Sequence, residues 1–265
     1  MRVPVAFGQY VPVESPVHAL DAKTKMGLVA AFTAGVFMVD GFGGLAAMAA
    51  AVVSAVALSR VPWRIAIRGL RALSFILAFT LMAHALRWNP ATVALVRLGP
   101  VAVDGPGLLT GLFFATRIVL LVVGTSLLTL TTTPVQLTDG LERVMRPLEI
   151  VRFPAGEVAM MLTIALRFIP TTAAEAEKIV IAQTARGARF DEGGPIRRAR
   201  AFVPVLVPLF VNLFRRAEEL AVAMESRCYR GGIGRTRLNE AAMGPADWAV
   251  LGGVSAVLIA VGVAL

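Results

Sequence analysis

Apolar residues form long runs in the first half of the chain and one more run at its end, separated by short polar or glycine-containing breaks. The runs cover residues 26–39, 45–58, 72–86, 108–131 and 247–265. A helix needs about 20 predominantly apolar residues to cross a bilayer. The pattern therefore predicts five membrane spans, of which the first is expected to borrow residues from the segment before it or to tilt little.

Arginines between the second and third runs predict how the spans are oriented. Arg60, Arg64, Arg68 and Arg71 lie in one short loop, and an excess of Lys and Arg marks the cytoplasmic side of a membrane. Counting from a cytoplasmic N-terminus then places the loop at 88–107 and the C-terminus on the outside.

Two smaller features belong to the ends of these runs. Lys23 and Lys25 precede the first run and are expected to stop the chain at a membrane surface. The loop at 88–107 contains Asn-Pro and Gly-Pro pairs, which are typical of turns. Within it, the alternation over residues 101–103 predicts a short extended piece.

The pattern changes after residue 131, where apolar positions recur at helical spacing with charges between them. Thr133 can cap a helix, Pro134 suits the first helical position, and Gln136 completes a capping box. The apolar residues that follow at steps of four, three and four are Leu137, Leu141, Val144 and Leu148. We therefore expect an amphipathic helix beside the membrane rather than across it.

A second helical stretch is predicted over residues 157–184. Its most apolar part, at 158–166, is too short to cross a bilayer. Pro170 is expected to bend or reset the helix, because proline lacks a backbone N–H and crowds the preceding turn. Gly187 stands where a helix end favours glycine.

A third helical stretch begins in the apolar run at 201–214 and stops before Gly231-Gly232. Its prolines, Pro204 and Pro208, favour an interfacial or buried position over a span.

The expected fold class is all-α: a polytopic membrane protein with about five transmembrane helices and a cytoplasmic domain of about three amphipathic helices. The expected divisions are 1–131 for transmembrane helices 1–4, 132–246 for the cytoplasmic helices, and 247–265 for the C-terminal transmembrane helix.

Composition supports membrane residence. The 265-residue chain is 57% hydrophobic and 16% charged, with a mean hydropathy of +0.75, whereas soluble domains are about a quarter charged. The net charge is +9, but the arginines lie beside apolar runs, so the positive-inside rule explains them better than nucleic-acid binding does. With one cysteine and two distant histidines, we expect no disulfide and no multi-cysteine metal site. Residues 1–10 lack the apolar core of a signal peptide.

Common catalytic motifs are absent from the sequence. It has no G-x-x-x-x-G-K-[ST] run, so the chain is not itself a P-loop ATPase. H-E-x-x-H and G-x-S-x-G are missing as well. We therefore predict no catalytic residue, metal or cofactor in this chain, and we interpret it as no enzyme.

Arg117 is the one charged residue within the fourth run. An arginine inside a span is costly and usually faces protein or water, which makes it a candidate functional residue. The alternative is that it lies near the outer interface and extends its charged end to water.

Several short motifs occur in one order along the chain. They are the segments at 15–21 (SPVHALD), 131–134 (TTTP), 166–170 (LRFIP), 182–187 (AQTARG) and 224–229 (MESRCY). Together they resemble the transmembrane T component of energy-coupling factor (ECF) transporters, the cobalt and biotin T subunits included. The resemblance covers most of the chain and is weakest at the last span.

The resemblance implies partners and docking residues. A T component of this family binds two ABC ATPase subunits, which hold ATP and Mg, and one substrate-binding S component. Its coupling helices end in two Ala-Arg-Gly motifs whose arginines dock in acidic grooves of the ATPases. By resemblance, Ala185, Arg186 and Gly187 carry the first motif. Ser226, Arg227 and Cys228 carry the second, in which serine replaces alanine and cysteine replaces glycine.

The chemistry of these residues fits docking, and it leaves alternatives open. A cation at a helix C-terminus is compatible with the helix dipole, and a guanidinium can bind a carboxylate through two bonds. Both arginines could instead pair with lipid phosphates or local carboxylates. Pro204 and Pro208 could contact the S component, although a simple helix kink is the favoured interpretation.

The resemblance therefore implies a coupling subunit of an ECF-type ABC importer for vitamins or metal ions. The chain is expected in the plasma (inner) membrane of a prokaryote, in contact with lipid, with its N-terminus and coupling domain in the cytoplasm and no nucleic-acid partner. The transported substrate is not specified, because another chain captures it in this family. The alternatives are a self-contained secondary transporter or channel, and a membrane-embedded enzyme. The first should show inverted repeats or several intramembrane charges, and the second a nucleophile or metal cluster in its spans.

Overall fold

The structure is a computed structural model that describes residues 10–88, 94–98, 101–151, 153–231 and 243–264. The described chain is predominantly helical, as the predicted all-α class requires, and it divides into two units. The first, which we call the bundle unit, contains the described residues up to 140 and from 243 onwards. The second, the rod unit, contains the described residues from 141 to 231.

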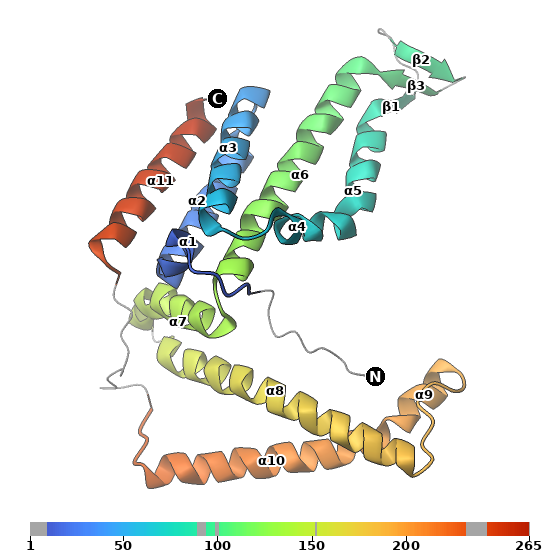
Figure 1. Ribbon diagram of the computed structural model, residues 1–265, viewed down its shortest axis with the longest axis vertical. Helices are drawn as coiled ribbons and strands as arrows, with labels where there is room; N and C mark the ends of the chain where they lie inside the picture. The colour runs from blue at the N-terminus through green and yellow to red at the C-terminus, as the bar shows by residue number, and fades with distance from the viewer. Residues whose placement is uncertain (1–9, 89–93, 99–100, 152, 232–242, 265) are drawn as a thin grey trace. The chain divides into compact units, whose positions relative to one another are not determined.

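The bundle unit consists of apolar helices around one core, and Figure 1 shows their order along the chain. Helix α6 packs against α2, α3 and α5, and α2 also packs against α11. The helices are α1 (Pro16–Ala19), α2 (Ala22–Met38), α3 (Phe42–Ser59), α4 (Trp63–Ala66), α5 (Arg68–Ala85), α6 (Gly105–Thr131), α11 (Pro245–Ala264) and the first part of α7 (Pro134–Met145). The largest fully buried apolar side chains are Leu45, Met48, Leu130, Val36, Val39 and Val56.

A small antiparallel sheet connects α5 to α6. Strands β1 (Leu86–Trp88), β2 (Ala94–Leu98) and β3 (Val101–Asp104) are ordered β1-β3-β2. The central strand β3 coincides with the short extended piece that the alternation at 101–103 predicts.

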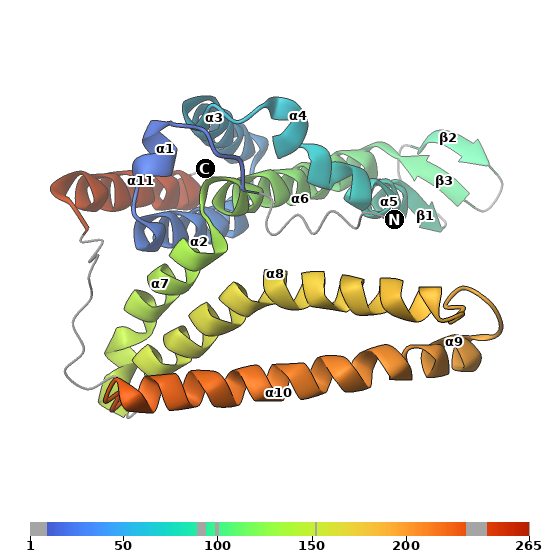
Figure 2. The ribbon, with the colours of Figure 1, turned by 60° about the horizontal axis from the view of Figure 1, so that its bottom comes forward.

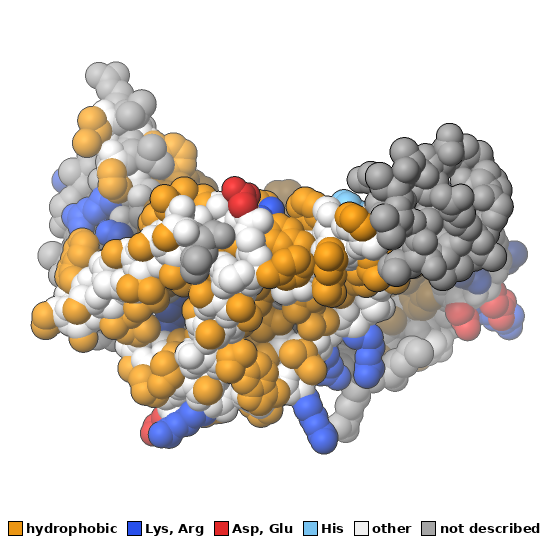
Figure 3. All heavy atoms as spheres, turned by 90° about the horizontal axis from the view of Figure 1, so that it is seen from above, with side chains coloured by type: hydrophobic (Ala, Val, Ile, Leu, Met, Phe, Trp, Pro, Cys, Tyr) orange, Lys and Arg blue, Asp and Glu red, His pale blue; other side chains and the backbone are white. Residues whose placement is uncertain are grey.

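Within the described part of the chain, four helices are long and apolar enough to cross a membrane: α3, α6, α8 (Ala155–Ala185) and α11. Three of them fall on predicted spans, whereas the fourth, α8, lies in the segment 132–246 that the sequence analysis placed beside the membrane. Helix α2 has 17 residues, which is short for a span, and α5 begins with two arginines, Arg68 and Arg71. Much of the surface seen in Figure 3 is apolar, and exposed side chains such as Phe75 on α5 suit contact with lipid.

Helix α8 differs from the sequence expectation. It continues unbroken through Pro170 for 31 residues, so the helix does not restart at this proline, and the alternative of a bend stays a prediction. Only the hydrogen bond of one missing N–H is lost there, and the turns on both sides keep their own bonds. The predicted separation of 1–131, 132–246 and 247–265 between membrane and cytoplasm stays a prediction.

Lys25, which is expected to stop the chain at a membrane surface, is buried against protein in the bundle unit. Its side chain, 5% exposed, donates to the carbonyl oxygens of His18 (3.1 Å) and Thr131 (3.0 Å). Ser15 caps α1 through the His18 amide (3.2 Å), and the Val11 amide donates to the Leu130 carbonyl (3.0 Å). Two of the motif segments, 15–21 and 131–134, are thereby joined by one ammonium group.

The last helix is held against the first long helix at two levels. Near its start, Asp247 Oδ1 accepts from the Asp21 amide (3.1 Å). Near its end, a Cβ added to Gly262 would lie 2.8 Å from the Gly35 carbonyl oxygen. Because small residues let helix backbones approach closely, the pair Gly35 and Gly262 sets the spacing of α2 and α11.

We predict that Gly262→Ala destabilises the bundle by about 1–3 kcal/mol, since the added methyl meets backbone and not a flexible side chain. Thermal unfolding in detergent measures the change. Gly252→Ala on the same helix is the matched control, because a Cβ there meets nothing within 4 Å. Equal melting temperatures for the two variants would contradict the close approach.

We also predict that Lys25→Met lowers stability by about 1–3 kcal/mol, because it leaves buried carbonyls without a donor. The half-exposed Lys23 supplies the control Lys23→Met, which should change stability by less than about 0.5 kcal/mol. The same unfolding assay compares them, and a Lys25 variant as stable as the control would refute the proposed role of the ammonium group.

Candidate functional site: two arginine tips on antiparallel helices

The rod unit is built from two long helices that run in opposite directions. Helix α8 (Ala155–Ala185) and α10 (Val203–Ser226) lie side by side, as Figure 2 shows, with η1 (Arg146–Val151) before α8 and the short α9 (Pro195–Ala201) between them. Residues Thr171 and Glu175 of α8 bond to Arg216 and Asn212 of α10, respectively. The residue order in these pairs is reversed, so the two helices are antiparallel.

The first predicted docking motif forms the C-terminus of α8. Ala185 is the last helical residue, Arg186 is the C-cap, and Gly187 has a positive φ of 90°. The Gly187 amide donates to the Thr184 carbonyl (2.9 Å), and the next amide, of Ala188, donates to the carbonyl of Gln183 (3.0 Å). These two bonds define a Schellman motif, in which the residue after the cap must adopt the left-handed conformation that glycine tolerates best.

The second predicted motif repeats this geometry at the C-terminus of α10. Ser226 ends the helix, Arg227 is the C-cap, and Cys228 has a φ of 56°. The Cys228 amide donates to the carbonyl of Glu225 (2.9 Å), and the Tyr229 amide donates to the carbonyl of Met224 (3.0 Å). A cysteine thus occupies the left-handed position of the first motif's glycine, although its Cβ makes that conformation costly. The thiol is exposed.

All six predicted motif residues are exposed: Ala185, Arg186, Gly187, Ser226, Arg227 and Cys228. Among the described residues, neither Arg186 nor Arg227 forms an ion pair or side-chain hydrogen bond, so no local carboxylate in that part of the chain occupies them. Both guanidinium groups are available to carboxylates or phosphates outside the rod unit. We call Arg186 and Arg227, with their flanking residues, the two arginine tips.

The two tips lie at opposite ends of the helix pair. Glu175 and Arg216 face each other across the pair (3.5 Å). Arg186 follows Glu175 by 11 residues, and Arg227 follows Arg216 by 11 residues. At 1.5 Å per residue, the tips are about 33 Å apart along the helices.

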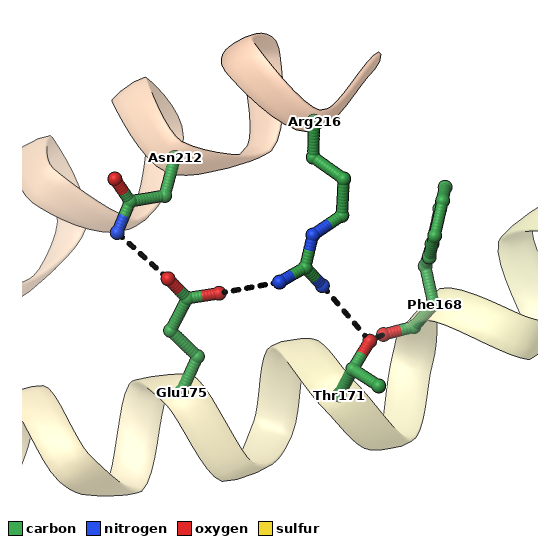
Figure 4. Close-up of polar contacts among 5 residues, drawn as sticks. All are labelled: Phe168, Thr171, Glu175, Asn212 and Arg216. Atoms are coloured by element: carbon green, nitrogen blue, oxygen red, sulfur yellow. Dashed lines mark hydrogen bonds and ion pairs between the residues drawn. The ribbon is translucent and has the colours of Figure 1, made fainter. Parts of the chain in front are cut away.

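A polar cluster that the sequence analysis missed joins the helices between the tips (Figure 4). Glu175 accepts from the Asn212 amide (2.7 Å) and pairs with Arg216 (3.5 Å). Arg216 also donates to the Thr171 hydroxyl (3.1 Å), which donates to the Phe168 carbonyl (2.8 Å), and its guanidinium lies over the Phe168 ring. We call these five residues the crossing cluster. Its hydrogen-bonded partners on the two helices lie 37 to 45 positions apart in sequence, so helical periodicity alone does not connect them.

Pro204 and Pro208, for which the sequence leaves a helix kink and a contact with the S component open, lie in α10 and are exposed. Pro204 is in the first turn, where no intrahelical N–H bond is lost. Pro208 lies inside the helix, which continues past it. Near them α10 presents exposed apolar side chains, including Val207, Phe210 and Phe214. The prolines thus belong to an apolar surface of the rod unit.

Arg117 faces protein. Its guanidinium donates to the carbonyl of Val39 at the end of α2 and lies over the ring of Phe113, 4.7 Å from the centroid. Within α6, the side chain therefore serves to join helices of the bundle unit. In the part of the chain that the structure describes, no group of three His, Cys, Asp or Glu residues could hold a metal ion.

Apolar helices long enough to span a bilayer, together with a helix pair that carries an exposed cationic tip at each end, are typical of an integral membrane protein. The sequence matches the model of the CbiQ family, cobalt transport protein, over residues 13–238. Relatives named energy-coupling factor transporter transmembrane protein EcfT match nearly the whole chain. The one from Thermosediminibacter oceani is 45% identical over 258 residues, which is 97% of this chain and 96% of that protein.

Two further relatives of the same name support the assignment. The Heliobacterium modesticaldum protein is 45% identical over 255 residues, covering 96% of this chain and 95% of its own length. The Bacillus subtilis protein is 42% identical over 253 residues, covering 96% and 94%. The chain therefore belongs to the CbiQ/EcfT family of transporter membrane components, as its motifs indicate.

The left-handed positions of the two tips predict opposite effects on local stability. Gly187→Ala should destabilise the end of α8 by about 1 kcal/mol, whereas Cys228→Gly should stabilise the end of α10 by up to about 1 kcal/mol. Amide hydrogen exchange at residues 183–188 and 224–229 measures both. Gly194→Ala is the control, because Gly194 has a φ of −70° and open space around its Cβ position. Changes of the same sign at both tips would contradict the Schellman geometry.

Proposed function

We propose that this chain is the coupling subunit of an ECF-type ABC importer, with each arginine tip docked in one of two partner ATPase subunits. The pair of exposed guanidinium groups at opposite ends of one antiparallel helix pair carries this proposal. Two separated cations on rigid helix ends suit two separate acidic sites. The names of the relatives, energy-coupling factor transporter transmembrane proteins, support the same assembly.

Docking through arginine has a physical basis in each tip. The Schellman bonds satisfy the last carbonyls of the helix, so the backbone needs no partner there. A guanidinium can then bind a carboxylate with two parallel bonds, while the small neighbours of Arg186, Ala185 and Gly187, allow a groove wall to approach. In the second tip, Ser226 and Cys228 add an oxygen and a sulfur at this surface. We therefore expect the second groove to be shaped differently from the first.

The coupling mechanism follows from this docking. ATP and Mg are held by the partner ATPases, and their closure on ATP binding displaces the tips. The rods transmit that displacement to a substrate-binding S component, for which the exposed apolar surface around Pro204 and Pro208 is the proposed contact. The chain does no covalent chemistry. It sits in the plasma membrane of a prokaryote, with its N-terminus and rod unit in the cytoplasm.

The proposed cargo is a vitamin or a metal ion. The family description, cobalt transport protein, favours small nutrients of this kind. The S component captures the cargo, so its identity is set by another chain. A self-contained secondary transporter is less well supported, since Arg117, the charge within α6, is engaged by Val39 and Phe113.

The test removes both guanidinium groups at once. In Arg186→Ala/Arg227→Ala, the ATPase subunits should no longer co-purify with the chain. Each lost charge-assisted contact is worth roughly 1.5–3 kcal/mol, so each single variant should bind roughly 10- to 100-fold more weakly. Affinity capture of the tagged chain followed by quantification of the ATPases measures this.

A matched control removes two other exposed arginines of the rod unit, in Arg198→Ala/Arg200→Ala. It lowers the net charge equally and should retain the ATPases. Arg186→Lys/Arg227→Lys should bind at an intermediate level, because lysine keeps the charge and loses the bidentate geometry. If the double alanine variant captures both ATPases at the parental level, the docking proposal is wrong.

A further inference from the structure

The three polar contacts between the rod helices correspond to one another when α8 and α10 are exchanged, as a local two-fold relation would require. An offset of 41 residues carries Glu175 to Arg216 and Thr171 to Asn212. When residues related by this offset are exchanged, the Asn212–Glu175 bond takes the place of the Thr171–Arg216 bond. The pair Glu175–Arg216 then exchanges its own two members. The two halves of the cluster therefore use different side chains in equivalent positions.

The same offset relates the two tips. It carries Arg186 to Arg227 and the left-handed Gly187 to the left-handed Cys228. Ala182 and Ala223 also correspond. Each tip lies 11 residues beyond its own member of the pair Glu175–Arg216, which is about 16 Å of helix. The crossing cluster is thus equidistant from both tips.

Apolar packing does not by itself define the register of these helices. Of the described residues of α8 and α10, only Ala155, Ala159 and Val205 are buried. Contacts between small or exposed apolar side chains allow one helix to slide along the other by a turn. A set of polar bonds made by donors and acceptors on both helices is satisfied in one register only. Glu175 is central to this set, because it accepts from Asn212 and pairs with Arg216 through different oxygens (Figure 4).

We propose that Glu175, Asn212 and Arg216 are positioning residues that fix the crossing of α8 and α10 midway between the arginine tips. The cluster then acts as the pivot of a lever with equal arms. This inference rests on the proposed docking of the tips: when two ATPases move both tips, helices pinned at their midpoint rotate about one another and do not slide. Loss of the pivot lets one helix shift without moving the other.

Spin labels on the two helices test the pivot. The label sites are Ala182→Cys and Ala223→Cys, which are exposed and related by the same offset. The native thiol is removed by Cys228→Gly, which matches the first tip. The sites are 14 residues apart along the pair, or about 21 Å along the helix axes. Double electron–electron resonance on the full-length chain in lipid nanodiscs gives the distance distribution.

The parent should give one narrow distance. Glu175→Ala and Arg216→Ala should each broaden the distribution roughly twofold, because register is no longer specified. Their controls are the exposed neighbours Glu177→Ala and Arg215→Ala, which should leave it narrow. The charge-reversed chain Glu175→Arg/Arg216→Glu should be narrower than either single variant, an outcome that a loss of folding cannot produce.

The outcomes separate the pivot from the docking proposal. Distributions for Glu175→Ala and Arg216→Ala as narrow as those of their controls would overturn the pivot and leave docking untouched. In Arg186→Ala/Arg227→Ala the distribution should stay narrow even though ATPases are lost, because the crossing cluster is intact. If that variant retains its ATPases while the pivot variants broaden, docking through the tips is wrong and only the register role of the cluster survives.

Discussion

The proposed docking surface of the rod unit depends on one backbone constraint: a left-handed residue directly after each C-cap arginine. This residue turns the chain back so that two amides satisfy the last carbonyls of the helix, and the arginine is left exposed at the end. Glycine meets the constraint in α8 and cysteine meets it in α10. The shared geometry explains why the second motif keeps its shape despite losing both the alanine and the glycine that the family pattern would provide.

The antiparallel pairing of α8 and α10 places the two arginine tips at opposite ends of one helix pair. Parallel helices would bring both arginines to the same end, where they would repel each other and meet a single partner. The observed pairing separates them by about 33 Å and puts the crossing cluster at the midpoint. A rod unit with few buried side chains relies on specific polar bonds for its register, and this suits a part that is proposed to move.

In the bundle unit, the corresponding requirement is that short apolar helices stay packed together. Two kinds of contact hold α2 against its neighbours. The backbones approach closely at Gly35 and Gly262, and the Lys25 ammonium group donates to two carbonyl oxygens. Lipid supplies little hydrophobic drive for helix association, so such packing and hydrogen bonds are the available sources of stability. Arg117 contributes in the same way, because its guanidinium group donates to the Val39 carbonyl at the end of α2.

Much of this protein was determined by its sequence alone. Apolar runs located the helices, and the turn chemistry of Thr133 to Gln136 and of Gly187 located helix ends, because these signals act over a few neighbouring residues. The five short motif segments, taken in their order along the chain, indicated the family for the same reason. Tertiary structure decided which segments meet. The burial of Lys25 and the pairing of Glu175 with Asn212 and Arg216 depend on partners tens of residues away, and no local pattern encodes them. The left-handed turn at Cys228 was likewise decided by hydrogen bonds to the helix end, which override the preference of a residue with a Cβ.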